Sequence, residues 1–294
     1  MTVLAAVSAA ATRLAAAGVE SPRFDAEELA AHVLGLRRGG LALAPAFAPD
    51  QQTAYAGLVE RRAERVPLQH LVGSTGFRHI ELLVGPGVFV PRPETESVVQ
   101  WALDALVATG PAPYAVVDLC TGSGTIALAL ADELPPGAVV HAVERDPVAY
   151  AWLQKNVAAA ALGRGTAVQA HLADAVDALP GMNGTLDLVV SNPPYVAVHE
   201  RGDVDPEVVD HDPEIALFAG DDGLDVVRVV ERAARRLLKP GGLLVVEHSD
   251  RQGETAPALL RERGWQDVAD HRDLAGRDRF VTAVQPVRSP VTAS

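Results

Sequence analysis

Residues 116–127 read Val116-Val117-Asp118-Leu119-Cys120-Thr121-Gly122-Ser123-Gly124-Thr125-Ile126-Ala127. The apolar, β-branched start predicts a buried strand, the two glycines predict a tight turn, and the residues after them predict a helix. Glycines let a backbone pass close beneath a ligand, and the free N–H groups at a helix start can bind it. The stretch therefore predicts the ligand-binding turn of an α/β domain.

The chain continues from this turn as an alternation of strands and helices. Helices are expected in most of the gaps between strands, and the strands are predicted at residues 114–119, 138–144, 166–171, 186–191, 242–248, 265–270 and 279–284. Such alternation is typical of a doubly wound, mostly parallel sheet. The predicted fold class is α/β, with seven strands in the sheet.

The chain before residue 91 has a different pattern. Residues 2–66 show helical periodicity and predict a small helical bundle, with Arg61, Arg62 and Arg65 on a solvated helix face. Residues 76–90 predict two short strands around Gly85-Pro86-Gly87. We expect a helical domain, a β-hairpin linker, a larger α/β domain and a flexible tail, at residues 1–73, 74–90, 91–286 and 287–294.

Composition narrows the class of protein. The 294 residues are 48% hydrophobic, enough for a substantial core. A net charge of −13 opposes binding to a phosphate backbone, so no nucleic acid is expected as the main partner. The single cysteine excludes an internal disulfide framework, and the histidine spacing suggests no metal site. No signal core or membrane span is recognised, so a cytoplasmic location is expected.

A second informative stretch, Ser191-Asn192-Pro193-Pro194-Tyr195, follows the apolar run at 186–190. It falls at the end of a predicted strand, where open α/β sheets hold ligands. The two prolines restrict the backbone and hold the Asn192 side chain and the Pro193 carbonyl as a rigid pair of acceptors. Such a pair suits the two N–H groups of an amide or exocyclic amine, and the Tyr195 ring offers a flat face. A proline turn with Asn192 as a local cap is the alternative interpretation.

Two cofactors compete for the glycine turn. Residues 122–127 also satisfy the GxGxxA pattern of dinucleotide-binding folds, and Glu144 stands 20 residues after Gly124. However, Asp118 would repel a pyrophosphate, whereas it suits the cationic amino-acid portion of S-adenosylmethionine. Asp174, after the third strand, can accept a hydrogen bond from an adenine amino group. These features favour S-adenosylmethionine, and an NAD-dependent oxidoreductase remains the alternative of a different class.

Several further stretches, taken in order, resemble the glutamine methyltransferases that modify peptide-chain release factors. The resemblance extends from about Pro67 to Val284. It is carried by the turn and the Asn-Pro-Pro-Tyr loop together with Pro67–Gly73, Pro91–Glu96, Glu214–Gly220, Asp222–Asp225, Leu237–Gly242 and Gly276–Arg279. Asn-Pro-Pro-Tyr alone also fits adenine-N6 DNA and guanine-N2 RNA methyltransferases, whereas the joint set is specific.

The resemblance implies a class I methyltransferase that acts as an S-adenosylmethionine-dependent protein-(glutamine-N5) methyltransferase. It would methylate the Gly-Gly-Gln glutamine of release factors and release S-adenosylhomocysteine, with the helical domain helping to hold the protein substrate. The enzyme is expected to be a monomer. Alternatives are a glutamine methyltransferase of a ribosomal protein and, less favoured, a nucleic-acid amine methyltransferase.

The resemblance also implies residue roles. Asp118, Cys120, Thr121, Gly122, Ser123, Gly124, Glu144, Asp174 and Asn192 would contact the cofactor, with Cys120–Gly124 under the methionine portion and Glu144 on the ribose hydroxyls. Asn192, Pro193 and Tyr195 would be catalytic, and the substrate contacts would be Asn192, Pro193, Pro194, Tyr195, Arg92 and Glu94. Pro93 and Glu94 also suit a helix start, so a structural role is the alternative for Glu94.

Three positions depart from the family pattern. Cys120 stands where Gly is frequent, and Glu144 stands where Asp is frequent. The added Cβ and the longer carboxylate affect contact geometry more than activity. Glu247-His248-Ser249-Asp250 replaces the Glu-Ile-Gly common at this strand end, and the sequence assigns it no role.

Overall fold

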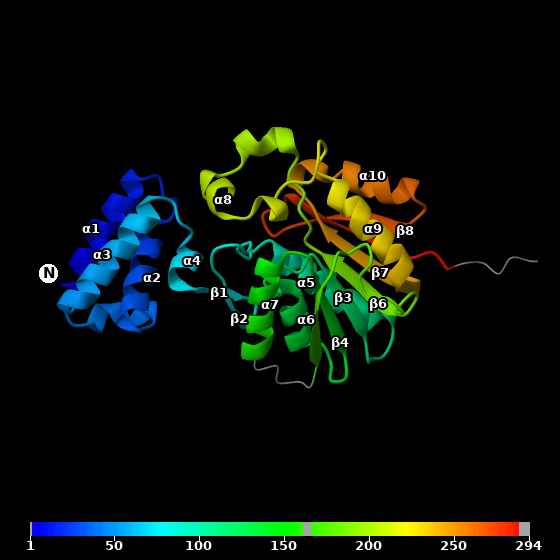
Figure 1. Ribbon diagram of the computed structural model, residues 1–294, viewed down its shortest axis with the longest axis horizontal. Coiled ribbons are helices and arrows are strands. Elements are labelled where there is room, and N and C mark those ends of the chain that lie inside the picture. Colours follow the sequence, from blue (N-terminus) through cyan, green and yellow to red (C-terminus); the bar gives the residue numbers. More distant parts are fainter. Residues whose placement is uncertain (1, 161–165, 288–294) are drawn as a thin grey trace, which may run out of the picture. The chain divides into compact units, whose positions relative to one another are not determined.

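The structure is a computed structural model that describes residues 2–160 and 166–287 (Figure 1). Its chain divides into two compact units. The first contains Met1–Ser74, Val84–Pro86 and Val204–Asp212, and the second contains Thr75–Leu83, Gly87–Asp203 and Pro213–Ser294, as far as these ranges are described. The tail expected at residues 287–294 lies outside the described residues, apart from Val287.

The first unit is the predicted helical bundle, which is confirmed. Its elements are α1 (Val3–Ala16), α2 (Pro22–Leu34), η1 (Arg38–Leu43), α3 (Pro49–Ala63), α4 (Leu68–Val72) and α8 (Pro206–His211). The Thr2 hydroxyl caps α1 by accepting a 3.3 Å hydrogen bond from the Ala5 N–H. Gly35 ends α2 in the left-handed conformation with φ of 63°. The bundle encloses a core of its own that includes Val7, Leu14, Leu29, Tyr55 and Val59.

One arginine of this unit is not on a solvated face, so that expectation is wrong for Arg62. Its side chain is buried and donates to Asp25 at 2.7 Å and to Glu207 at 2.8 Å. Glu207 belongs to α8, which is distant in sequence from α2 and α3. Helical periodicity cannot reveal such a distant carboxylate partner. Arg61 is exposed, as expected.

The second unit is built on a seven-stranded sheet, which confirms the predicted doubly wound, mostly parallel architecture. The strand order is β5 (Ala167–Leu172), β4 (Val139–Glu144), β3 (Ala115–Leu119), β6 (Leu186–Ser191), β7 (Leu238–Glu247), β9 (Asp278–Val284) and β8 (Gln266–Arg272). Strand β9 runs antiparallel to both of its neighbours, β7 and β8, and the other adjacent pairs of this sheet are parallel. The chain order reverses between β3 and β6, and ligands of open α/β sheets bind at such a point.

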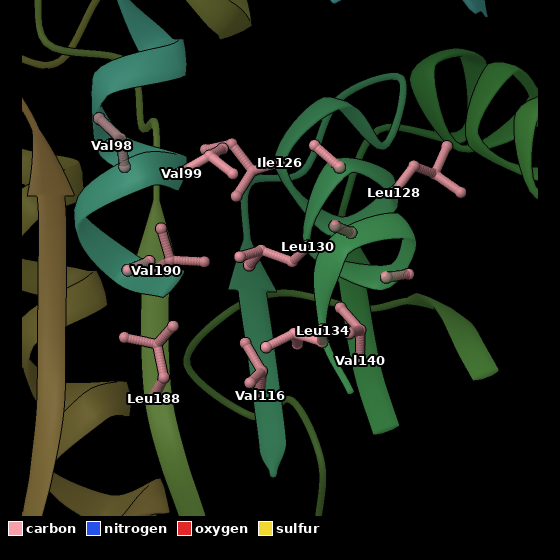
Figure 2. Close-up of a cluster of buried hydrophobic side chains, with 14 of the residues drawn as sticks. Val98, Val99, Val116, Ile126, Leu128, Leu130, Leu134, Val140, Leu188 and Val190 are labelled. Atoms are coloured by element: carbon pink, nitrogen blue, oxygen red, sulfur yellow. The ribbon is translucent and has the colours of Figure 1, made fainter. Parts of the chain in front are cut away.

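Helices cover both faces of this sheet. One face packs against α5 (Thr95–Thr109), α6 (Thr125–Glu133) and α7 (Pro147–Ala159), and the other against α9 (Asp225–Leu237) and α10 (Thr255–Glu262). Figure 2 shows Val116 and Val140 of the sheet directed toward Leu130 of α6 and Leu134, the residue that follows this helix. Every residue of β6 is buried, as a strand covered on both faces requires. Within residues 2–160 and 166–287, no helix is both long and apolar enough to cross a membrane.

The predicted hairpin exists, but its turn was placed wrongly. The strands are β1 (Ser74–Phe77) and β2 (Ile80–Leu83), so the chain reverses at Arg78 and His79. Arg78 takes a left-handed φ of 49°. Its N–H donates to Glu96 at 3.0 Å and its guanidinium to Glu133 at 2.5 Å. These tertiary contacts stabilise a turn that contains no glycine. The turn was predicted at Gly85-Pro86-Gly87 instead, because glycine and proline are the residues typical of turns.

Three short 3-10 helices complete the described structure of the second unit. They are η2 (Val198–Asp203), η3 (Glu214–Ala216) and η4 (Asp250–Gln252). The first two flank residues 204–212 of the first unit. After the Asn-Pro-Pro-Tyr loop the chain therefore belongs to the second unit up to Asp203, to the first unit at Val204–Asp212, and to the second unit again from Pro213.

Candidate active site

The predicted site residues follow the carboxyl ends of four neighbouring strands. Asp174 comes after β5, Glu144 ends β4, Cys120 follows β3, and Asn192 follows β6. In the parallel register, Leu119 is paired with Ser191 on one side and with Val143 on the other. Asn192 and the turn at 120–124 therefore leave adjacent strands at the same edge of the sheet.

Asp118 is buried at the base of the glycine turn, with 1% of its surface exposed. Its Oδ2 accepts hydrogen bonds from the Thr121 hydroxyl at 2.5 Å and from the Ala127 N–H at 3.0 Å. Its Oδ1 has no partner within the described part of the chain. Burial raises the pKa of Asp118 to about 7, against the lowering effect of the Thr121 hydrogen bond. An unpaired buried carboxylate oxygen suits a cationic ligand group.

The turn itself runs through three left-handed residues. Cys120, Gly122 and Gly124 have φ of 60°, 58° and 92°. A Cβ on Gly124 would lie 2.7 Å from Leu153, whereas a Cβ on Gly122 would meet nothing within 4 Å. A left-handed backbone favours glycine at both positions, and at Gly124 the missing Cβ also leaves room for Leu153. The turn keeps an open face above Gly122.

A buried asparagine that the sequence analysis missed holds this turn. Asn156 of α7 donates to the Ser123 carbonyl at 2.9 Å and to the Leu83 carbonyl at 3.0 Å. Its Oδ1 accepts from the Leu83 N–H at 2.7 Å. The side chain connects the end of β2 to the turn. A polar residue in the helical pattern of α7 was the only sequence signal for this contact.

Glu144 faces the turn from the next strand. Its Oε2 accepts from the Gly122 N–H at 2.9 Å, and its Oε1 accepts from the Asp146 N–H at 2.8 Å. Burial raises the pKa of Glu144. Because a carboxylate offers about four acceptor positions, acceptor capacity remains for ligand hydroxyls. Asp174 is half-exposed, accepts from the Val176 N–H and lies 4.0 Å from Arg145.

The Cys120 thiol is held neutral by its surroundings. Burial, together with the charges of Glu144 and Asp118, raises the pKa of Cys120 to about 12. The thiol form is a weak nucleophile compared with the thiolate. Cys120 is therefore compatible with an electrophilic methyl donor next to it.

The Asn-Pro-Pro-Tyr loop is fixed at both of its ends. Ser191 donates its hydroxyl to the Leu119 carbonyl at 2.6 Å, which ties the start of the loop to β3. Pro193 and Pro194 are buried, and Asn192 is half-buried with its Nδ2 donating to the Thr95 hydroxyl at 3.2 Å. The Tyr195 hydroxyl lies 3.5 Å from Glu247. Burial and the charge of Glu247 raise the pKa of Tyr195, so its phenol remains neutral.

The backbone of Tyr195 is packed against a glycine and a glutamine that the sequence analysis did not assign. Gln252 donates to the carbonyl of Tyr195 at 3.1 Å and to that of Asp222 at 3.2 Å. A Cβ on Gly223, whose φ is 72°, would lie 2.3 Å from the Tyr195 carbonyl oxygen. The close approach explains why the Asp222–Asp225 stretch carries a glycine.

Arg92 and Glu94 lie beside the loop, with contacts of their own. The Arg92 guanidinium lies 5.1 Å from the Phe89 ring centre, and Glu94 lies 3.7 Å from Arg277. The charges of Arg92 and Glu94 act in opposite directions on the pKa of Tyr195. Among the residues that the structure describes, no group of three or more His, Cys, Asp or Glu side chains could hold a metal ion.

Comparisons with known protein families match both parts of the chain. Residues 5–73 match the model of the PrmC N-terminal domain, and residues 80–214 match that of the methyltransferase small domain. A search of solved structures found the hMettl16 catalytic domain in complex with MAT2A 3′UTR hairpin 6, with a TM-score of 0.52 and 16% identity over 85% of this chain and 86% of that chain. This structural likeness supports the class I methyltransferase fold.

Curated relatives match over nearly the full length. The release factor glutamine methyltransferase of Streptomyces coelicolor is 54% identical, over 96% of this chain and 97% of that protein. Those of Mycolicibacterium smegmatis and Deinococcus radiodurans are 47% and 42% identical, over 97% and 93% of this chain and 98% and 95% of theirs.

Proposed function

The chain belongs to the family of release factor glutamine methyltransferases, and from this premise we propose that it methylates the N5 amide nitrogen of the Gly-Gly-Gln glutamine in peptide-chain release factors. The methyl donor in this proposal is S-adenosylmethionine, and the product is S-adenosylhomocysteine. The observation that supports it most directly is that Asn192 follows β6 and the Cys120–Gly124 turn follows β3, and that these two strands are adjacent and paired. That arrangement brings an amide-binding loop to a cofactor-binding turn.

The residues of the turn fit the cofactor. The unpaired Oδ1 of Asp118 suits the ammonium group of the methionine portion, and Glu144 retains acceptor capacity for the ribose hydroxyls. Asp174 is assigned to the adenine amino group. Thr121 and Ser123 are also assigned to cofactor binding, through the backbone of the turn. When bound, the cofactor supplies an electrophilic methyl group on a sulfonium.

The loop residues act on the nucleophile. An amide nitrogen is a poor nucleophile because its lone pair is delocalised into the carbonyl. In the proposal, Asn192 Oδ1 and the Pro193 carbonyl each accept one N–H of the target amide, which directs its lone pair along the line of transfer. The new N–C bond forms as the S–C bond of the sulfonium breaks, and the nitrogen loses one of its protons to solvent as positive charge develops on it. Pro194 stiffens the loop, and the Tyr195 ring lies along the plane of the amide. Positioning of this kind can supply ~7–11 kcal/mol.

The division of labour along the chain follows from this reaction. We assign residues 1–73 to holding the release factor, residues 74–90 to a linker, and residues 91–286 to methyl transfer. Arg92 and Glu94 are assigned to substrate contacts beside the loop. The active species is proposed to be a monomer that acts on release factors in the cytoplasm, without nucleic acid or metal as a partner.

The test is incubation of the purified chain with a release factor and labelled S-adenosylmethionine. Mass spectrometry of the Gly-Gly-Gln peptide should show one added methyl group on the glutamine. A release factor with that glutamine replaced by alanine should stay unlabelled. Label on a ribosomal protein or on RNA, with the release factor unmodified, would overturn the proposal.

A further inference from the structure

The Asn-Pro-Pro-Tyr loop has few backbone groups by which the fold can hold it. Pro193 and Pro194 carry no N–H, and in the proposed reaction the Pro193 carbonyl has to stay free for the target amide. The hydroxyl of Ser191 fixes the start of the loop. The position of its other end therefore depends on contacts to Tyr195 and to the residues after it.

The side chain of Gln252 makes three hydrogen bonds to three separate segments. Its Nε2 donates to the carbonyl of Tyr195 at 3.1 Å and to that of Asp222 at 3.2 Å. Its Oε1 accepts from the Ser249 N–H at 3.0 Å. The partners belong to the loop after β6, to the segment before α9 and to the segment after β7. One side chain thus joins the end of the loop to two other parts of the second unit.

These bonds are possible in only one orientation of the Gln252 amide. An amide has two donors on its nitrogen and acceptor lone pairs on its oxygen. The flipped amide would turn its oxygen toward two carbonyl oxygens and its nitrogen toward an N–H group. Gln252 has 6% of its surface exposed, so little water is present to replace a lost partner. Both carbonyls therefore depend on the two donors of this amide.

A local capping role accounts for only part of the arrangement. Gln252 ends the short helix η4, and its Oε1 closes that turn by accepting from Ser249. A carboxylate could accept the same N–H group, but it could not supply two donors. Those donors reach residues that are 57 and 30 positions away in the sequence. The amide is therefore used for tertiary contacts as well as for the cap.

Gly223 lies against the same contact. A Cβ at this position would lie 2.3 Å from the Tyr195 carbonyl oxygen and 2.6 Å from Gln252 Nε2. The next residue of the loop segment, Val196, exchanges backbone hydrogen bonds of 2.8 and 2.9 Å with residues 217–219. The chain that leaves the loop is thus held against the segment before α9 from its first residue.

We propose that Gln252 is a positioning residue for the methyl transfer, which fixes the Tyr195 end of the loop so that the Pro193 carbonyl and the Tyr195 ring keep their places beside the target amide. The inference rests on the proposed function, because it specifies what holds the amide-binding loop. The three hydrogen bonds of the Gln252 side chain all lie outside the turn at residues 120–124. Loss of these bonds should therefore lower kcat and leave cofactor binding intact.

The substitution Gln252→Glu makes the loop contact titratable, which a purely structural role would not reproduce. When ionised, the introduced carboxylate has no hydrogen to donate and faces two carbonyl oxygens, whereas the protonated form regains one donor. Burial and the two carbonyls favour the protonated form. The kcat of this variant, relative to wild type, should therefore recover as the pH is lowered from about 9 to about 6.

The charged groups on the surrounding segments keep one state or cancel in this comparison. Asp222 stays ionised, because its hydrogen bond with Arg228 lowers its pKa to about 2. Arg251 stays charged, since hydrogen bonds to two carboxylates raise its pKa, and burial keeps the Tyr195 phenol neutral. Glu247, with its pKa raised to about 7 by burial, titrates in wild type and variants alike. Each rate is therefore divided by the wild-type rate at the same pH.

The experiment measures kcat for Gln252→Met and Gln252→Glu at saturating cofactor and release factor. Gln252→Met removes both donors at similar volume and should lower kcat about 10- to 100-fold at every pH, because the loop is displaced from its reacting geometry. Its KM for S-adenosylmethionine should stay within about twofold of wild type. Gln252→Glu should be as slow as Gln252→Met at alkaline pH and should approach wild type at acidic pH.

Gln285→Glu is the matched control in the same unit. The Gln285 Nε2 also donates to a backbone carbonyl, that of Arg235, at 3.0 Å. However, Gln285 lies beside Gly241 and Gly242 of β7, away from the carboxyl end of this strand. Gln285→Glu should alter thermal stability and leave kcat and its pH profile unchanged.

All rates are compared at a temperature where circular dichroism shows every variant to be folded. A kcat of Gln252→Met equal to wild type would overturn this inference alone. So would a loss in Gln252→Glu that does not change with pH, or an equal loss in Gln285→Glu. A wild-type chain that leaves the release-factor glutamine unmodified would overturn the proposed function and this inference together.

Discussion

The Ser191 hydroxyl donates a 2.6 Å hydrogen bond to the Leu119 carbonyl, across the pair of strands where the sheet reverses its order. Each of the two residues is the last of its strand. The bond therefore fixes the spacing between the residues that come next, Cys120 and Asn192. A change that loosens it would separate the two halves of the proposed site.

Asn192→Ala should reduce methylation of the release factor by about 100- to 1,000-fold, the range seen when one preorganised polar contact to a reacting group is removed. Cofactor affinity should fall much less, because Asp118 and Glu144 remain. Single-turnover kinetics and calorimetric titration with S-adenosylmethionine would measure the two effects. Asn183→Ala, at an exposed asparagine paired with Arg236, is the matched control and should be silent. Turnover near the wild-type rate would contradict the amide clamp.

Asp118→Asn should weaken S-adenosylmethionine binding by about 10- to 100-fold, since it removes a charged hydrogen-bond acceptor from a buried site. The pKa of Asp118 in the free protein is raised to about 7, and a cationic ligand binds best to the ionised form. Wild-type affinity should therefore rise as the pH increases toward about 7. The variant should lack this rise. Calorimetry across the pH range would decide, and parallel profiles would exclude Asp118 as the ammonium partner.

The same carboxyl gives a prediction for stability without cofactor. Its pKa is raised from 3.8 to about 7 on folding, so between these values the folded state holds a proton that the unfolded chain has lost. The contribution of Asp118 to the free energy of unfolding is then highest below its unfolded pKa and falls as the pH rises through the folded one. The Asp118→Asn variant should gain stability relative to wild type between about pH 4 and about pH 7. Urea unfolding at both ends of this window measures the difference, and a constant difference would refute the assignment.

Gly223→Ala should lower turnover by more than its loss of folding stability alone would cause. The new Cβ would lie 2.3 Å from the Tyr195 carbonyl oxygen and 2.6 Å from Gln252 Nε2. Gly241→Ala is the matched control, because its φ of 80° gives similar backbone strain, of about 1–2 kcal/mol, with nothing within 4 Å of the Cβ. Turnover and unfolding should be measured on both variants. Equal turnover at equal stability would show that the Tyr195 backbone is not displaced.

Arg62→Ala should destabilise the helical unit by about 3–5 kcal/mol, because it leaves the buried Asp25 and the partly buried Glu207 without their shared partner. Arg61→Ala, on the same helix but exposed, should change the free energy of unfolding by about 0.5 kcal/mol or less. Denaturant unfolding followed by circular dichroism gives both values. A small change in the free energy of unfolding for Arg62→Ala would mean that the two carboxylates become hydrated when the unit relaxes.

The sequence predicted the parts of this protein that depend on local pattern. The strands at β3 and β6 were recognisable because buried parallel strands are continuous apolar runs. The turn at 120–124 and the proline loop were recognisable because their backbone chemistry needs glycine and proline. The seven-stranded sheet followed from these elements in order.

What the sequence did not show depends on contacts between distant residues. The hairpin turns at Arg78 because hydrogen bonds to Glu96 and Glu133 stabilise the turn there. The sequence around residue 78 does not indicate that these two residues are its partners. Thr95 stood inside a recognised motif, but its hydrogen bond with Asn192 forms only once the start of α5 and the loop after β6 lie together. A hydrogen bond between two secondary-structure elements produces no periodic pattern in the sequence.

Because residues 204–212 pack within the helical unit, a single cut of the gene cannot separate the two units. A fragment ending at residue 74 would contain Arg62 without Glu207. Transplanting the bundle onto another methyltransferase would require grafting this distant nine-residue strap as well. The same unit also contains Val84–Pro86, so these residues would have to be transferred together with the strap.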